Sequence, residues 1–251
     1  MRERRFVAEE PELNEWGQPV GVRVENWRGA KRPVREIMTG PRCRLEPLVA
    51  DQHALALHEA YRTEETRRNW TYLPYGPFDT AEAYTEWVRS GEGKEDPLFF
   101  AVVDAATNSP LGVASYLRVF PELGSIEVGH LSYSPLLQQT PISTEAMYLM
   151  MRRVFDDWGY RRYEWKCHSL NAPSRAAAER LGFRFEGVFR NSVVLKGRNR
   201  DTAWFSITDA EWPRIKDALE EWLAPSNFDA AGRQRALLGD LMPATAGRST
   251  I

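Results

Sequence analysis

Three consecutive β-rich segments, each ended by turn residues, constrain the fold of this chain more than any other feature. They span residues 98–104, 110–120 and 125–133, and the two connections are rich in Asn, Ser, Pro and Gly. Short connections of this kind join antiparallel neighbours, so the sequence predicts an antiparallel meander. A sheet built in this way needs helices to cover its apolar faces.

Helical patterns lie on both sides of the predicted meander. Thr80 to Gly91 carries apolar side chains at helical spacing, and a longer apolar stripe runs from Pro141 to Trp158. Before the meander we expect a strand over 42–49 and a helix that Asp51 caps, with Leu55, Leu57 and His58 near its buried side. After the long helix we expect a strand over 161–168 and a helix that Asn171 caps and Gly182 closes. The last expected elements are a hairpin of 184–196 with 202–208 and a helix over 211–223. This order predicts a mixed α/β fold in which helices flank a largely antiparallel sheet.

The chain divides into three parts by pattern. Residues 1–41 mix Pro, Gly, Trp and charge without a sustained period, so they are expected to form an extended arm anchored by Trp16 and Trp27. Residues 42–212 hold the predicted sheet and helices and form the main domain. Residues 213–251 are expected to form a C-terminal helix and a weakly patterned tail.

Composition excludes several classes of protein. Hydrophobic residues make up 43% of the 251 positions, which is too many for a disordered chain, and a net charge of −2 lacks the basic excess of a general nucleic-acid binder. We find no apolar run long enough for a signal peptide or a membrane span. Cys43 and Cys167 lie far apart, and the histidines have no metal-ligand spacing, so we expect a reduced, cytoplasmic setting without a metal.

The segment from Gln138 to Ala146 joins the end of a predicted strand to the start of the long predicted helix. The first turn of a helix leaves backbone N–H groups without partners and carries partial positive charge, so it can bind a diphosphate. The plain alternative is a helix start that Thr140 caps, with Pro141 at the first helical position. The turn indicates a ligand only together with other motifs.

This segment resembles the acyl-CoA loop of the GNAT superfamily of N-acetyltransferases, in the branch that contains the ribosomal-protein N-terminal (serine/alanine) acetyltransferases. Gln138 matches the first position of the family pattern, and Thr-Glu-Ala at 144–146 matches the triplet that follows the pattern in this branch. The family pattern has Gly where Pro141 stands in this chain, and Gly or Ala where Ser143 stands. Pro141 removes one N–H donor and Ser143 adds a side chain. The N–H groups that remain for a diphosphate belong to Gln139, Thr140, Ile142, Ser143 and Thr144.

Further segments match the same family in the same order. Residues 171–183 resemble its Asn-x-x-Ser…Leu-Gly-Phe helix, and residues 125–131 resemble its central strand, with His130 where Tyr is common. Lys196-Gly197-Arg198, Asp201-Thr202 and Glu211-Trp212 resemble the closing hairpin and final motif. The resemblance covers about 42–212.

The resemblance implies an acyl-CoA N-acyltransferase fold and acetyl-CoA as co-substrate. It implies direct transfer of the acetyl group to a primary amine, either the N-terminal amine of a protein or peptide or a small amine. The expected catalytic residues are Glu127, His130 and Ser174. The expected cofactor contacts are Leu131, Tyr133, Gln138, Gln139, Thr140, Ile142, Ser143, Thr144, Asn171 and Ser174.

Each catalytic candidate has a structural alternative. Glu127, a carboxylate on a half-buried strand, can act as the base or can pair with an Arg. His130 is a second candidate for the base or a packed side chain. Ser174 can protonate the departing thiolate or can only orient the thioester at the third position of its helix. A strand cysteine such as Cys167 is usually inert, which favours direct transfer over an acyl-enzyme.

The acceptor side is less constrained by the sequence. The aromatic loop of residues 70–75 is expected to contact the amine, although ordinary surface packing is also compatible with its composition. The alternative function is a non-catalytic acyl-CoA-binding or regulatory module. Both a monomer and a homodimer stay open.

Overall fold

An eight-stranded sheet forms the centre of the structure, a computed structural model that describes residues 11–243. The strands are β3 (Met38–Thr39), β4 (Cys43–Pro47), β5 (Leu98–Asp104), β6 (Pro110–Phe120), β7 (Ser125–Tyr133), β8 (Arg162–His168), β9 (Arg184–Leu195) and β10 (Arg198–Thr208). Their order across the sheet is β3-β4-β5-β6-β7-β8-β10-β9. All neighbours are antiparallel except β7 and β8, which are parallel. The predicted meander is confirmed as β5, β6 and β7.

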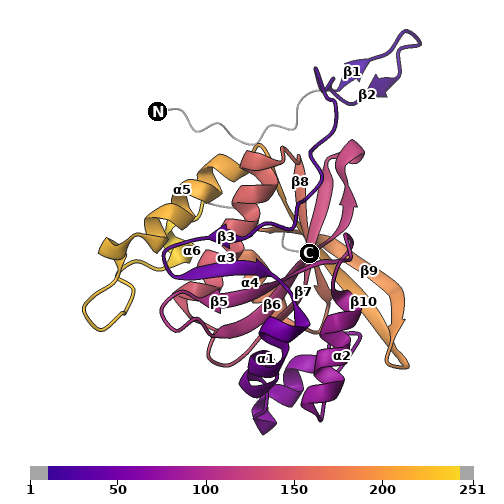
Figure 1. Cartoon of the computed structure of the whole chain (residues 1–251). Coiled ribbons are helices and arrows are strands. Elements are labelled where there is room, and N and C mark those ends of the chain that lie inside the picture. Colours follow the sequence, from indigo (N-terminus) through magenta and orange to yellow (C-terminus); the bar gives the residue numbers. More distant parts are fainter. Residues whose placement is uncertain (1–10, 244–251) are drawn as a thin grey trace.

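Within residues 11–243, six α-helices flank the sheet (Figure 1). They are α1 (Leu55–Ala60), α2 (Ala81–Gly91), α3 (Pro141–Arg152), α4 (Ala172–Arg180), α5 (Trp212–Leu223) and α6 (Leu238–Leu241). Side chains alternate across β5, so Phe100 belongs to a core shared with α3, α4 and α5, whereas Phe99 belongs to a second core shared with α1 and α2. The predicted fold class, helices around a largely antiparallel sheet, is therefore confirmed.

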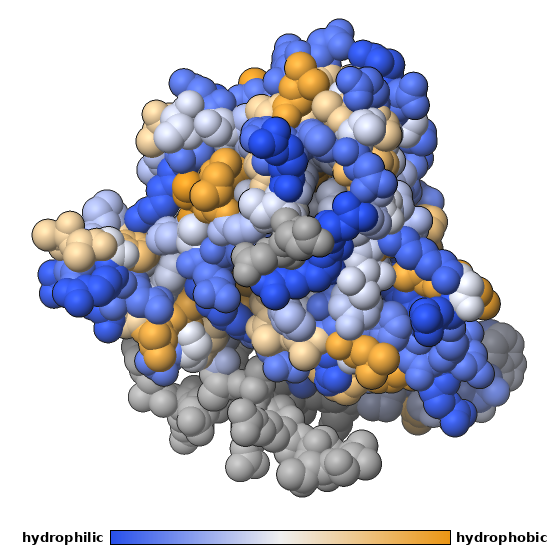
Figure 2. All heavy atoms as spheres, turned by 90° about the horizontal axis from the view of Figure 1, so that it is seen from below, coloured by the Kyte–Doolittle hydropathy of each residue, from blue (hydrophilic) through white to orange (hydrophobic). Residues whose placement is uncertain are grey.

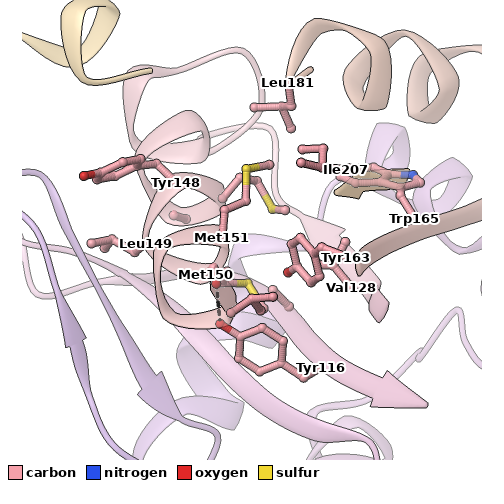
Figure 3. Packing of buried hydrophobic residues seen from close by; sticks show 14 of the residues in the cluster. Tyr116, Val128, Tyr148, Leu149, Met150, Met151, Tyr163, Trp165, Leu181 and Ile207 are labelled. Carbon is pink, nitrogen blue, oxygen red and sulfur yellow. Dashed lines mark hydrogen bonds between the residues drawn. The ribbon is translucent and has the colours of Figure 1, made fainter. Parts of the chain in front are cut away.

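Aromatic rings fill the centre of the larger core, and a tyrosine of the sheet bonds to the backbone of α3. Tyr116 of β6 and Tyr163 of β8 are fully buried, and the Tyr116 hydroxyl donates to the carbonyl of Met150 at 2.9 Å. Figure 3 shows this bond beneath the side chains of α3, with Trp165 beside the same cluster. This bond ties the middle of α3 to the centre of the sheet.

Most helix boundaries follow the predicted capping residues. The Thr140 and Asn171 side chains accept from the N–H groups of Ser143 and Ser174. Gly182 follows α4 with a positive φ of 92°, which a left-handed helix end requires.

The predicted cap at Asp51 is wrong. Val49 occupies the cap position, and the free N–H of Ala50 is bound by the Glu92 carboxylate instead. Asp51 pairs with Arg89 at 2.9 Å on the surface. Leu55, expected near the buried side, is 70% exposed, whereas Leu57 is buried as expected, because residues two positions apart lie on different faces of a helix.

The arm and the tail both contact the sheet-and-helix body within the described residues. Trp16, a predicted anchor, is 75% exposed in the small hairpin of β1 (Glu12–Leu13) and β2 (Pro19–Val20) that projects from the body in Figure 1. Trp27 does anchor the arm, since its indole N–H donates to the Glu122 carbonyl at 3.0 Å. After α5, the tail folds back so that Leu238 is buried. Residues 1–10 and 244–251 lie outside the described residues.

Apolar side chains do not form one broad patch on the face seen in Figure 2. Small apolar areas alternate there with hydrophilic ones wherever the surface is not covered by grey atoms. Scattered apolar residues are normal on a protein surface and need no partner.

Glu145 connects α3 to the first strands of the sheet. Its side chain is 3% exposed and accepts hydrogen bonds from the backbone N–H groups of Arg42 and Cys43 at 2.7 and 2.8 Å. The Arg42 guanidinium lies 3.4 Å away. A buried carboxylate with these partners fixes the β3–β4 turn against the start of α3.

We predict that Glu145→Ala lowers the free energy of unfolding by about 3 kcal/mol, because two buried N–H groups lose their acceptor. Denaturant unfolding of the purified variant measures this loss. Glu179→Ala, which removes an exposed carboxylate from α4, is the matched control and is expected to stay within about 0.5 kcal/mol of the parent. Equal effects of the two variants would contradict this role of Glu145.

Candidate active site

The parallel strands β7 and β8 separate part-way along their length. They pair only from Ser125 with Arg162 to Val128 with Trp165, although β7 continues to Tyr133 and β8 to His168. The Ser134 N–H bonds across to Leu111 in β6, so alternation along the strand directs the N–H groups of Leu131 and Tyr133 toward β8. The separation therefore leaves a row of backbone groups facing an open wedge.

The N-terminus of α3 lies at the end of this wedge. Seven residues connect it to β7, and the Gln138 side chain donates back to the Tyr133 carbonyl at 2.7 Å. Asn69, from the aromatic loop region, donates to the same carbonyl at 3.1 Å. These bonds fix the α3 start against the last residue of β7.

The first turn of α3 keeps part of its donor set free. The N–H of Gln138 bonds to Ser134, and the N–H of Ser143 bonds to the capping hydroxyl of Thr140 at 3.3 Å. The Ser143 hydroxyl is directed back to the Thr140 carbonyl at 2.7 Å. Within residues 11–243, the N–H groups of Gln139, Thr140 and Ile142 are left for a ligand.

Thr144 lies behind this turn. It is 1% exposed, and its hydroxyl accepts from the Arg180 guanidinium of α4 at 3.1 Å. Thr144 therefore joins α3 to α4, and its side chain does not reach the surface of the turn. Ala146, the last residue of the same sequence triplet, is fully buried in the core.

His130 sits in a β-bulge of β7. One residue of β6, Ala114, lies opposite both His130 and Leu131, and His130 has a φ of 51°. Its Nδ1 is 3.0 Å from the Tyr75 hydroxyl, and the two rings are stacked. Burial lowers the pKa of His130 to about 4, with the Arg118 charge acting in the same direction. At neutral pH the imidazole is uncharged.

Glu127 is enclosed by two cations. Its carboxylate is bound by Arg118 at 2.7 Å and by Lys166 at 2.8 Å, and Lys166 also binds Glu164 at 2.7 Å. Burial raises the pKa of Glu127 above its usual range, and the two cations oppose that shift. The sequence left open whether Glu127 pairs with an arginine. The structure shows that pair with Arg118 and a second one with Lys166.

Ser174 lies on the other side of the wedge, at the start of α4. Its hydroxyl oxygen accepts from the Trp165 indole N–H at 3.0 Å. Asn171 caps the same helix, and its side-chain oxygen accepts from the Ser174 N–H at 3.2 Å. Burial raises the pKa of the nearby Cys167 thiol, which keeps it protonated.

The aromatic loop reaches the site through Tyr75. Trp70 is 3% exposed and belongs to the core under α1 and α2, whereas Tyr75 contacts His130. Tyr72 lies edge-on to the ring of His168 at the end of β8. The loop therefore forms one wall beside the wedge, and its Trp is a packing residue.

Residues that act only as partners of the site residues carry no sequence motif of their own. Arg118 and Lys166 meet their partner through strand register, Asn69 through loop folding, and Arg180 through the packing of α4 against α3. Lys166 offered one signal, because it shares the polar face of β8 with Glu164 while Trp165 points to the core.

Among the described residues, no three His, Cys, Asp or Glu side chains gather as a metal site. No helix within residues 11–243 is long and apolar enough to cross a membrane.

Comparison with known proteins agrees with this geometry. The model of the acetyltransferase (GNAT) domain family matches residues 42–184. The chain belongs to the GNAT family of acetyltransferases. This acetyltransferase therefore uses acetyl-CoA as its acyl donor and an amine as its acceptor class.

Solved structures and curated relatives support the same family. A GCN5-related N-acetyltransferase from Brucella melitensis is 47% identical, with a TM-score of 0.85 over 87% of this chain and 99% of that chain. A probable GNAT acetyltransferase from Chromobacterium violaceum is 37% identical, with a TM-score of 0.73 over 78% and 98%. The uncharacterized N-acetyltransferase YnaD of Bacillus subtilis is 24% identical over 56% of this acetyltransferase and 81% of its own length.

We predict that acid weakens the folded state through His130. Its folded pKa of about 4 lies below its ordinary value of 6.5, so the unfolded chain binds the proton more readily between these values. Stability then falls by about 2 kcal/mol from pH 7 to pH 5, and His130→Gln removes this contribution. Urea unfolding of both proteins at each pH measures it. A pH dependence that is identical in the two proteins would show that His130 does not titrate in this way.

Proposed function

We propose that this acetyltransferase transfers the acetyl group of acetyl-CoA directly to a primary amine in a ternary complex. The acceptor is the N-terminal amine of a protein or peptide, or a small amine. The wedge between β7 and β8, which ends at the N-terminus of α3, is the observation that carries the proposal. It places free backbone donors next to a positive helix end, as a thioester with a diphosphate requires.

The cofactor is held mainly by backbone groups in this proposal. The N–H groups of Gln139, Thr140 and Ile142 bind the diphosphate, and the hydroxyls of Thr140 and Ser143 line the same turn. Leu131 and Tyr133 bind the pantetheine arm through their backbone on the β7 side. Gln138, Asn171 and Thr144 contribute by fixing the loop and the two helix starts that surround the cofactor.

A relative with this fold supports the choice of ligand. The microcin C7 self-immunity acetyltransferase MccE was solved in complex with acetyl-CoA and AMP, and it shares the fold at 19% identity with a TM-score of 0.59. At that identity the likeness concerns the fold alone. The turn of this chain must therefore be tested on its own residues.

Ser174 supports the departing thiolate. The Trp165 indole donates to the Ser174 oxygen, so the hydroxyl keeps its own proton to donate, and the thiol of Cys167 is a neighbour that the thioester sulfur would replace as its acceptor. The hydroxyl orients the thioester and stabilises developing charge on the sulfur. Because the Cys167 thiol stays protonated, it is a poor nucleophile, which favours direct transfer over an acyl-enzyme.

Glu127 and His130 are the proposed proton acceptors. Neutral His130 lies in the bulge beside the wedge, and buried Glu127 is three residues earlier in β7, bound to Lys166. Nδ1 of His130 faces the Tyr75 hydroxyl, so the proton acceptor would be Nε2. Nε2 can accept a proton only in the tautomer in which Nδ1 carries the hydrogen. Glu127 would receive it through water beside Arg118, whose side chain is 54% exposed.

The weakness of both bases favours acceptors that are already neutral. An α-amino group near pKa 8 is substantially uncharged at pH 7.5, whereas an amine near 10.4 is uncharged about once in a thousand molecules, a cost of roughly 4 kcal/mol. The proposed acceptor is therefore an α-amine or a weakly basic small amine. A Vibrio cholerae protein described as a ribosomal-protein-serine acetyltransferase shares this fold at 19% identity, with a TM-score of 0.60.

A thiol-release screen separates this enzyme from a non-catalytic acyl-CoA-binding module. The purified chain is incubated with acetyl-CoA and N-terminal peptides, polyamines, amino sugars or small amines, and free coenzyme A is measured. We expect release above background with at least one α-amine. Binding of coenzyme A, seen as a rise in Tm, without release for any amine would support the regulatory module instead.

We predict that Ser143→Asp weakens binding of coenzyme A at least about tenfold while the apo protein keeps its Tm. A carboxylate in the first turn favours the helix but repels a diphosphate there. Ala83→Asp is the matched control, because Ala83 occupies the same third position of α2 behind the cap Thr80. Titration calorimetry with coenzyme A measures both variants. Unchanged affinity in Ser143→Asp would place the diphosphate elsewhere.

We predict that Glu127→Gln or His130→Ala lowers kcat at pH 7.5 by about 100-fold, since general-base catalysis typically contributes that much. The thiol-release assay with the best amine of the screen measures kcat. Full turnover in both variants would show that neither residue accepts the proton, even though the chain is a GNAT acetyltransferase.

A further inference from the structure

The tip of the β9–β10 hairpin is attached to the aromatic loop by one lysine. Lys196 Nζ donates to the backbone carbonyls of Trp70 at 2.8 Å, Gly76 at 2.9 Å and Tyr75 at 3.3 Å. The lysine is about 120 positions from its acceptors, and Figure 1 shows the hairpin end on the same side of the sheet as α2. Among the described side chains, no carboxylate pairs with Lys196.

The hairpin turn is shaped to present this lysine. Leu195 pairs with Arg198, so Lys196 and Gly197 form a two-residue turn, with positive φ values of 48° and 72°. Turns of this type favour Asn, Asp or Gly at the first position, and a lysine there is conformationally costly. Its contacts with three carbonyls offset that cost.

The aromatic loop is shaped to receive the lysine. Its three carbonyl oxygens converge on one ammonium group, and Trp70 ends a 3-10 helix (Glu64–Trp70), where negative partial charge favours a cation. Gly76 has a φ of 65°, and a Cβ there would lie 2.6 Å from the Trp70 ring. Only glycine permits this close approach, which brings the carbonyls of the loop together.

The loop transmits the attachment to the active site. The Tyr75 residue whose carbonyl accepts from Lys196 also places its hydroxyl 3.0 Å from His130 Nδ1. Its ring lies between Trp87 of α2 and the imidazole, at centroid distances of 4.5 and 5.6 Å. A shift of the loop backbone would therefore move the partner of His130.

We propose that Lys196 is a positioning residue that fixes the aromatic loop against the β9–β10 hairpin and, through Tyr75, holds His130 in place beside the acceptor. This inference rests on the proposed function for its catalytic part only. The attachment itself is a property of the fold. The lysine acts at a distance from the acetyl group and touches neither the thioester nor the proposed diphosphate turn.

The test compares Lys196→Met, Lys196→Arg and Arg198→Met. Arg198 is an exposed basic residue of the same hairpin whose side chain makes no hydrogen bond or ion pair within the described part of the chain, so its loss controls for charge alone. Amide hydrogen exchange of residues 70–76 reports the attachment, and steady-state kinetics with the best amine of the screen report its effect on transfer.

We expect exchange at residues 70–76 to speed up about tenfold in Lys196→Met, because hydrogen bonds from a charged donor are lost. For the amine, kcat/KM should fall by a similar factor, whereas KM for acetyl-CoA should not change. Lys196→Arg should restore part of both effects, and Arg198→Met should match the parent. Unchanged exchange in Lys196→Met, or equal effects in Arg198→Met, would overturn the proposal.

A second arm tests the route through Tyr75. Tyr75→Phe keeps the backbone carbonyl and removes the hydroxyl, so it breaks the link to His130 without releasing the loop. We expect the imidazole NMR titration of His130 to move toward its ordinary range in Lys196→Met, and the kinetic effects of Lys196→Met and Tyr75→Phe to be less than additive in the double variant. Full additivity with an unmoved His130 titration would refute the route.

The two proposals fail in different ways. If the parent releases no thiol with any amine, the proposed function fails, but exchange at residues 70–76 still reports whether Lys196 holds the loop. If the parent is active and the loop is unaffected in Lys196→Met, only the role of Lys196 is refuted.

Discussion

The short parallel pairing of β7 with β8 is the constraint on which the rest of the site depends. Adjacent parallel strands cannot be joined by a tight turn, so the chain must cross over between them, and here α3 makes that crossover. The crossover starts where β7 ends. The N-terminus of a long helix is thereby placed beside the backbone groups that the separating strands leave unpaired. The topology, rather than any single side chain, brings together the two features that a nucleotide thioester can use.

Buried charge stabilises the point at which the strands separate. Glu127 and Glu164 lie directly opposite each other in register, which alone would be repulsive. Lys166 sits two residues beyond Glu164, in the part of β8 that no longer pairs with β7, and binds both carboxylates. Removing a partner from such a cluster leaves a buried charge uncompensated, so the cluster also limits how far Glu127 can change its protonation. The structural role of Glu127 and its proposed role as a proton acceptor are therefore coupled.

Local signals in the sequence predicted most of the fold and only part of the site. Strand alternation, the caps Thr140 and Asn171 and the closing Gly182 each act within a few residues, and the structure shows them where they were expected. Asp51 failed as a cap because Glu92, some forty residues away, binds the helix N-terminus instead.

The partners of the site residues also come from distant segments. Arg118 and Lys166 reach Glu127, and Tyr75 reaches His130, only after the sheet and the aromatic loop have formed. No spacing in the sequence encodes these contacts.

Pro141 removes one N–H donor from the proposed cofactor turn, but it does not disturb the start of α3. At the first helical position the missing N–H is one that the helix itself would not use, and the fixed φ of proline favours the helical start. The loss is one donor to the diphosphate, while the bonds of Thr140 to Ser143 hold the turn in shape before any ligand arrives. A turn that is ordered in advance loses less conformational entropy on binding, which offsets part of the missing hydrogen bond. Pro141 is therefore compatible with the proposed binding of a diphosphate at this turn.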